Sequence, residues 1–258
     1  MKSAQLGKLF FRTPCFVISA TLLLLLSSCS PDEVAVETDA LELDAEDDLA
    51  TRAGAPLFEG MGDHHHPITS TDPDAQRYFD QGLIIDFAFN HAESVRSFRA
   101  AQTLDANCAM CYWGEALALG PNINVTSNGK VIMSDEDRVK AYAAIQKALA
   151  LKNNSSEAER DYIDALATRY NGNPATPRAP LDEAYANAMR KLHHKYPDDD
   201  DAASLFAESM MNTMPWDYWL DPENPRALTV EVLEALETVL ERAPRHPFPK
   251  WSAMHNLF

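Results

Sequence analysis

The sequence predicts an all-α protein in which pairs of helices stack along the chain, and two observations carry this prediction. From Asp74 onward the chain is rich in Ala and Leu and has few β-branched runs, which favours helices over strands. Small and aromatic residues also recur with a period of about 34 residues once insertions are allowed, which indicates a repeated helix pair. We expect about four units over residues 73–258, the last of them incomplete.

The first repeat unit shows the pattern most clearly. Gly82, Ser94, Phe98 and Ala101 are spaced like the small and aromatic residues through which two helices interlock in tetratricopeptide (TPR) repeats. A second unit is in phase with the first, and two weaker units follow. The pattern therefore predicts a TPR-like helical-hairpin solenoid. The matching residues of the second unit are Tyr112, Ala116, Leu119, Ala141, Ile145 and Ala148.

The expected connections between helices alternate in length. Those from one pair to the next are short, whereas those inside the later pairs are long. Because alternate connections lie at opposite edges of a solenoid, the long A-to-B loops gather at one edge, where insertions commonly build a binding face. The short turns are expected near 105–107, 152–156 and 197–200, and the long loops near 120–135, 170–180 and 215–227.

Two surfaces are candidates for binding a protein or peptide partner. The long-loop edge combines aromatic rings with amides and a carboxylate, which supply contact area and directed hydrogen bonds. The inner face of the first helices is a groove of the kind that holds peptides in repeat proteins. Alternatively, the tryptophans fill gaps between helices and the groove residues belong to the core. The candidates are His91, Asn122, Asn124, Trp216, Asp217, Tyr218 and Trp219 at the edge, and Gln76, Phe79, Asp86, Met110 and Trp113 in the groove.

Residues 1–28 have the order of a secretory signal peptide. Lys2, Lys8 and Arg12 precede a short apolar stretch at residues 16–26, and small residues follow. The ending Leu-Ser-Ser-Cys resembles the bacterial lipobox, which implies cleavage before Cys29 and lipidation of its thiol. A plain signal peptide or an N-terminal anchor helix is the alternative. We expect an exported protein that a lipid anchors in the cell envelope, in the outer membrane if the host is Gram-negative.

The segment that follows the lipobox is strongly acidic, and so is the chain as a whole. Residues 29–72 read as a flexible tether with a His-rich entry segment, because acidic stretches with few aromatic residues stay solvated. The net charge is −17, and removal of the three basic residues of the signal peptide leaves about −20. Such a charge repels nucleic acid and anionic lipid, so we expect membrane contact only through the lipid anchor.

Residues 56–246 carry several motifs that together resemble a family of exported bacterial TPR lipoproteins, which is largely uncharacterised. The family has no assigned activity, so the resemblance implies the fold and the location and no chemistry. Beyond residue 247 the family continues with a His/Tyr-rich helix and further repeats, from which this chain departs, so we expect a truncated or frame-shifted end. The motifs are His64-His65-His66-Pro67, Ala75-Gln76-Arg77-Tyr78-Phe79-Asp80-Gln81-Gly82, Phe89-Asn90-His91-Ala92-Glu93, Ser97-Phe98, Cys108-Ala109-Met110-Cys111-Tyr112-Trp113-Gly114, Gly120-Pro121-Asn122-Ile123-Asn124 and Pro215-Trp216-Asp217-Tyr218-Trp219.

One group of residues has metal-ligating chemistry. His64, His65 and His66 precede the first helix at the edge where Cys108 and Cys111 open the third, and neighbouring first helices of a solenoid lie side by side. Two thiolates three residues apart share a helix face, and with imidazole they suit zinc or copper. The cysteines are alternatively a disulfide or buried free thiols.

No signature of catalysis accompanies this group. A zinc-deaminase reading of His91, Glu93, Cys108 and Cys111 fails, because a helix of roughly 20 Å separates His91 from the cysteines. We therefore expect a lipid-anchored scaffold that binds a protein or peptide and is not an enzyme, with no resident cofactor. The alternatives are a zinc- or copper-binding envelope protein that uses the histidines and cysteines, and a carbohydrate-binding module that uses Trp216 and Trp219.

Overall fold

A computed structural model describes residues 48–123, 133–221 and 223–248, all of which belong to one compact unit. Cys29 with the expected signal peptide, Asn124 and residues 249–258 lie outside the described residues. Residues 48–53 are helical. The further elements are α2 (Pro73–Phe87), α3 (His91–Leu104), α4 (Ala109–Ala118), α5 (Asp135–Leu151), the 3₁₀ turn η1 (Lys152–Asn154), α6 (Glu157–Ala167), α7 (Arg178–Lys195), α8 (Asp200–Thr213), β1 (Trp219–Asp221), β2 (Asn224–Pro225) and α9 (Ala227–Arg242).

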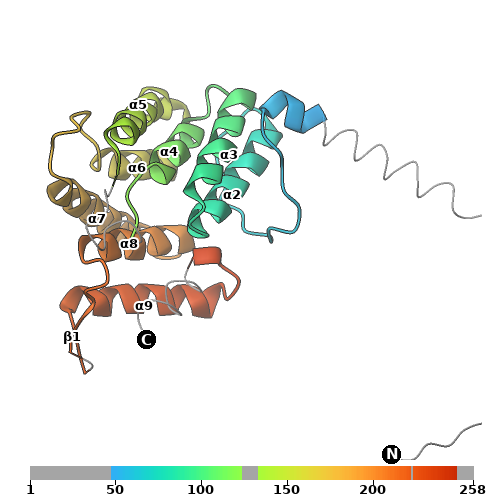
Figure 1. The fold of residues 1–258 in the computed structure, drawn as a ribbon. Coiled ribbons are helices and arrows are strands. Elements are labelled where there is room, and N and C mark those ends of the chain that lie inside the picture. The colour runs from blue at the N-terminus through green and yellow to red at the C-terminus, as the bar shows by residue number, and fades with distance from the viewer. Residues whose placement is uncertain (1–47, 124–132, 222, 249–258) are drawn as a thin grey trace, which may run out of the picture. The chain divides into compact units, whose positions relative to one another are not determined.

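The predicted all-α class is confirmed for the described residues, with one short exception. Each of the helices α2 to α9 packs against the next one along the chain, and α4 also contacts both α2 and α6 (Figure 1). The long connections follow α4, α6 and α8, and the short ones follow α3, α5 and α7, as the sequence predicts. The third long connection contains the antiparallel pair β1–β2, in which Trp219 lies opposite Pro225, and this hairpin was not expected.

Side-chain oxygens cap the first turns of four helices, α2, α5, α6 and α8. The carboxylate of Asp72 caps α2, which continues with Pro73, and Ser134 caps α5. Ser156 and Glu159 form a reciprocal capping box at the start of α6. Asp199 caps α8. These caps satisfy amide groups that a helix end leaves without partners.

Phe98 is the central contact of the first helix pair. Its side chain is fully buried, and its ring lies against the backbone of Gly82 in α2 and of Gly114 in α4, where any side chain would overlap it. The hydroxyl of Ser94 donates to the carbonyl of Gly82 at 2.7 Å. The small residues of the predicted repeat pattern therefore permit the close approach of α2, α3 and α4.

The flexible tether expected over residues 29–72 is wrong for residues 48–72. Leu49, Ala53 and Ala55 are buried in the core. The hydroxyl of Tyr78 donates to the carbonyl of Ala55 at 2.7 Å, and the amide of Phe58 donates to the Gln81 side chain at 2.6 Å. Apolar side chains of residues 48–58 are thus buried, and backbone groups of this segment form hydrogen bonds with side chains of α2. The acidic composition of the segment did not indicate either contact.

None of the helices in the described part of the chain is both long and apolar enough to span a bilayer.

Gly114→Ala is expected to destabilise the fold by about 1–3 kcal/mol, because a methyl group would overpack the Phe98 ring. Urea unfolding followed by circular dichroism measures the effect. The control is Val139→Ala on the exposed side of α5, which should stay within about 0.5 kcal/mol of the parent. Equal stabilities of the two variants would contradict this packing.

Candidate metal centre

Residues 63–71, here called the strap, run across α2 and α6 and are held by side chains of both helices. The Gln76 side chain donates to the carbonyl of His66 at 2.8 Å and accepts from the amide of Ile68 at 2.9 Å. On α6, Glu159 accepts from the amide and the hydroxyl of Thr69, each at 2.6 Å. The strap therefore occupies the helix face that the sequence assigned to a peptide partner.

The prediction that a partner contacts Phe79, Met110 and Trp113 is wrong for this structure. All three side chains are buried, and the Trp113 indole donates to the carbonyl of Tyr162 at 3.1 Å. Aromatic packing between α2, α4 and α6 encloses them. Of the groove residues, Gln76 binds the strap, and Asp86 belongs to the interior network described below.

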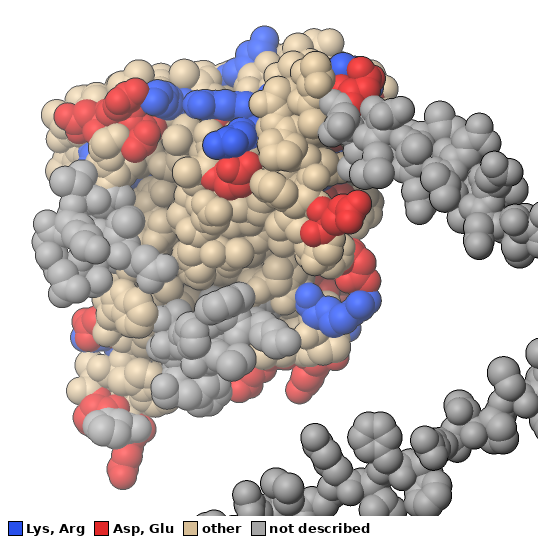
Figure 2. All heavy atoms as spheres, turned by 45° about the vertical axis from the view of Figure 1, so that its right-hand side comes forward, with Lys and Arg blue, Asp and Glu red and all other residues tan. Residues whose placement is uncertain are grey.

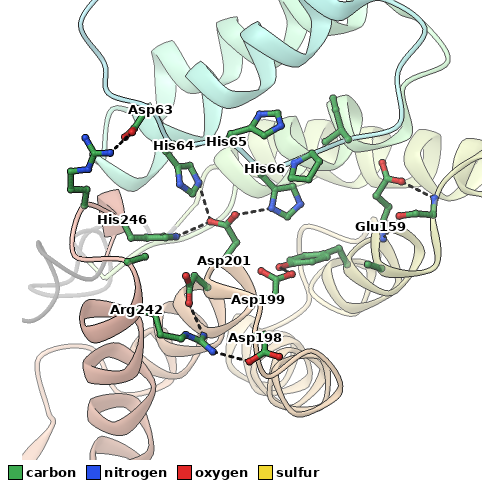
Figure 3. Close-up of a pocket in the computed structure, with 18 of the residues that line it drawn as sticks. Asp63, His64, His65, His66, Glu159, Asp198, Asp199, Asp201, Arg242 and His246 are labelled. Carbon is green, nitrogen blue, oxygen red and sulfur yellow. Dashed lines mark hydrogen bonds and ion pairs between the residues drawn. The ribbon is translucent and has the colours of Figure 1, made fainter.

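Three histidines surround the carboxylate of Asp201 in the first turn of α8 (Figure 3). One oxygen, Oδ1, lies 3.1 Å from His64 Nε2 and 3.0 Å from His246 Nε2. The other oxygen, Oδ2, accepts from His66 Nδ1 at 2.7 Å. His64 and His66 come from the strap, whereas His246 follows α9. The site therefore joins three segments that are far apart in the sequence.

A second carboxylate lies beside this group. Asp199 accepts a hydrogen bond from the Tyr162 hydroxyl at 2.9 Å. Ligand atoms of His64, Asp201 and His246 lie within 4.8 Å of one another, and so do those of His66, Asp199 and Asp201. Both sets combine imidazole nitrogen with carboxylate oxygen, the donor types that zinc and related ions use.

The electrostatics of the site keep Asp201 ionised. Burial raises the pKa of Asp201, but contacts with His246, His64 and His66 outweigh it and hold this pKa well below its usual range. Burial lowers the pKa of His66, but the hydrogen bond and the charge of Asp201 raise it above the ordinary value. A buried anion of this kind needs hydrogen bonds or positive charge around it, which imidazole groups or a metal ion can supply.

The histidines and Asp201 line an open pocket of about 930 Å³ between the strap, the start of α6, the start of α8 and the end of α9. Among the described residues, six carboxylates and two guanidinium groups line it. The arginines are already paired, Arg242 with Asp198 and Asp200, and Arg245 with Asp63. The pocket thus has an excess of negative charge, which favours a cation.

The predicted metal cluster of His64, His65, His66, Cys108 and Cys111 is corrected in part. Cys108 and Cys111 form a disulfide at the start of α4 and are buried, so their sulfur atoms are not free for a metal. The side chain of His65 is 57% exposed and pairs with Asp80 at 2.8 Å. Only His64 and His66 lie in the centre.

Asp201 and His246 were not predicted from the sequence as residues of the site. Asp201 belongs to an acidic run, residues 198–201, that is typical of an exposed turn, and His246 stands in a segment interpreted only as the end of a repeat. In the structure Asp201 and His246 are 6% and 5% exposed, whereas the side chain of Asp198 is fully exposed. The position of Asp201 in the first turn of a capped helix could have marked it in the sequence. Nothing in the sequence of the strap indicated that the strap would bury Asp201.

At the long-loop edge, the polar candidates form an interior network. His91 Nδ1 pairs with Asp86 at 2.8 Å, and His91 Nε2 lies 2.9 Å from the amide nitrogen of Asn122. Burial lowers the pKa of His91, but the Asp86 carboxylate outweighs it and raises that pKa overall. Asn122 is buried, so the expected role of this residue as a partner contact is wrong.

The aromatic candidates of the same edge divide between surface and interior. Trp216 is 48% exposed and Trp219 37% exposed, whereas Tyr218 is buried and cannot contact a partner as expected. Asp217 is exposed and pairs with Arg226 at 2.6 Å. Trp216 has a backbone φ of 61°, which is strained for a bulky residue, and its indole donates to the carbonyl of Ile123 at 2.9 Å. Two tryptophans therefore remain available on the surface.

Glu159→Gln is expected to lower the free energy of unfolding by about 1–3 kcal/mol at pH 7, because an amide cannot accept all the hydrogen bonds from Thr69 and Ser156. Burial raises the pKa of Glu159, but these hydrogen bonds outweigh it and depress the pKa below 4.5. A depressed carboxyl pKa stabilises the fold above the unfolded-state value and loses that effect as the pH falls.

The difference between parent and variant should therefore shrink as the pH falls below about 4.5. Urea unfolding at several pH values measures it. The neighbouring Glu157→Gln is the matched control, because the Glu157 side chain is 70% exposed and its ion pair contributes little. A loss for Glu157→Gln as large as that for Glu159→Gln would contradict the role of Glu159 in holding the strap.

Comparisons of the chain with protein-family models, with curated proteins and with solved structures found no match.

Proposed function

We propose that this chain is an exported, lipid-anchored helical-repeat protein that binds a divalent transition metal through His64, His246 and Asp201. One observation carries the proposal. The Nε2 atoms of two histidines that are 182 residues apart both lie about 3 Å from a single carboxylate oxygen, Asp201 Oδ1. Two imidazoles and one carboxylate are a donor set found in zinc and non-haem iron sites with open positions.

The spacing of these atoms supports a shared ion. Two ligand atoms that each lie about 2.1 Å from a metal, at an angle of about 90–109°, are about 3.0–3.4 Å apart. His64 Nε2 is buried and outside hydrogen-bond geometry to Asp201, and it has no hydrogen-bond partner among the described residues. A buried nitrogen without a well-aligned hydrogen bond is costly, and metal coordination would remove that cost.

The residues around the centre fit the same proposal. His66 donates to Asp201 Oδ2, which orients the carboxylate as hydrogen bonds beyond a metal's own ligands commonly do. The pocket gives an ion a path from solvent, and the carboxylate excess of its lining attracts cations. An ion held by His64, His246 and Asp201 would supply Lewis acidity at the pocket.

The fold and location in the proposal rest on two kinds of observation. The order of helices, the contacts of α4 with α2 and α6, and the small residues around Phe98 support a TPR-like arrangement. The lipobox-like ending at Cys29 supports a lipid anchor in the envelope. On the face drawn in Figure 2, Lys and Arg side chains are interspersed with Asp and Glu, which gives nucleic acid no basic patch.

A protein or peptide partner at the long-loop edge is a second candidate function, which one observation favours. Trp216 is strained at φ 61°, yet nearly half of its surface is exposed. Strained backbone and exposed tryptophan both concentrate at binding surfaces. Trp219 and Leu220 in the same long loop are also exposed apolar side chains. It lies on a different part of the chain from the metal centre, so the two functions are compatible.

The full chain, extracted in detergent without chelator, is expected to bind at least one Zn²⁺ per molecule in equilibrium dialysis with elemental analysis. His246→Ala should weaken binding at least tenfold, because loss of a direct ligand costs no less than loss of a residue that orients one. His65→Ala and the double variant Cys108→Ser/Cys111→Ser are the matched controls and should retain the metal. Absence of bound metal, or equal loss in a control, would contradict the proposal.

Trp216→Gly is expected to leave the melting temperature unchanged or slightly raised, because glycine relieves the strain at φ 61° while the indole's contacts are lost. If the long-loop edge binds a partner, this variant should lose the cross-linked species that the parent forms in envelope preparations. Val139→Ser, an exposed change on α5, is the control. Identical cross-linking of parent and Trp216→Gly would argue against this second function.

A further inference from the structure

We propose that Asp201 bridges two metal ions, and that the second ion is a divalent transition metal held by His66, Asp199 and Asp201 Oδ2. The His66 nitrogen that donates to Oδ2 would release its proton to solvent when it binds the ion. This inference rests on the proposed function and extends it from one ion to two. The two oxygens of the carboxylate face different donor sets, since Oδ1 faces His64 and His246 while Oδ2 faces His66. A carboxylate with ligands on both sides is the usual bridge of a two-metal site.

Asp199 supplies the third ligand group of the second donor set, beside His66 and Asp201. Its carboxylate and the facing atoms of His66 and Asp201 lie within 4.8 Å of one another. Asp199 also caps α8 and accepts from Tyr162, and each oxygen of a carboxylate can accept a hydrogen bond and still ligate an ion. This donor set holds two carboxylates and one imidazole, so its formal charge is negative whether or not His66 carries a proton, and a divalent cation neutralises it.

The surroundings hold these side chains in place as ligands require. The Tyr162 hydroxyl donates to Asp199 Oδ2 at 2.9 Å, and the other oxygen of Asp199 caps α8 through the amide of Ala202. The ring of His66 lies edge-on to the ring of Tyr162, with centroids 5.3 Å apart. The backbone amide of His66 donates to the side chain of Asp80. Such hydrogen bonds and packing fix ligand orientation in metal sites.

The charge of the pocket is sufficient for two ions. The six carboxylates and two guanidinium groups of its described lining sum to a formal charge of −4. One divalent ion at His64, His246 and Asp201 would neutralise half of that charge. Both donor sets border the same open pocket, so the second ion has access from solvent.

Metal stoichiometry in the full-length chain tests the inference, with Co²⁺ as the probe because its absorption and paramagnetic resonance spectra report coordination and coupling. We expect two Co²⁺ per chain in the parent, with magnetic coupling between them. Asp199→Asn should bind one Co²⁺ without coupling. Asp198→Asn is the matched control, because it removes a fully exposed neighbouring carboxylate, and it should bind two.

The outcomes separate this inference from the proposed function. No bound Co²⁺ in the folded parent overturns both. One ion in the parent that Asp199→Asn retains overturns the bridged pair and leaves the first site standing. Two uncoupled ions, or two ions in Asp199→Asn, place the second ion elsewhere and also overturn the inference. If Asp199→Asn fails to fold, Tyr162→Phe should weaken the second ion's affinity about tenfold and leave the first unchanged.

Discussion

The buried carboxylate of Asp201 is the constraint around which the site is organised. It is held between the strap, the start of α8 and the segment after α9, and each of these segments contributes an imidazole or the carboxylate itself. A buried anion is costly unless positive charge or hydrogen bonds surround it. The pairing with three histidines, or with metal ions between them, therefore determines where the strap and the residue after α9 can lie.

The strap also explains why the helix face of α2, α4 and α6 is not an open groove. Gln76, Glu159 and Asp105 bind its backbone and its small hydroxyl side chains. The polar groups on this face therefore bind the strap, which belongs to the same chain, and not a separate peptide. Beneath it, Phe79, Trp113 and Tyr162 pack as core. The strap thereby brings His64 and His66 to α8, and the helix face that the sequence assigned to a peptide partner instead positions the cluster of histidines around Asp201.

Much of the fold was predictable from the sequence, because helix pairs depend on local periodicity. Gly82, Ser94 and Phe98 were identified as interlocking residues, and they make those contacts. The site was predictable only in part. His64 and His66 were chosen for their chemistry, but their partners Asp201 and His246 depend on long-range packing of a segment that composition described as a solvated tether. The disulfide between Cys108 and Cys111 was one of three alternatives that spacing alone could not separate.

The most direct test of the account is anomalous X-ray diffraction at the zinc absorption edge from crystals of the Zn²⁺-treated protein. We expect a zinc peak about 2.0–2.2 Å from His64 Nε2, His246 Nε2 and Asp201 Oδ1. An ordered Asp201 site without a peak, or with zinc bound only at surface residues, would contradict it.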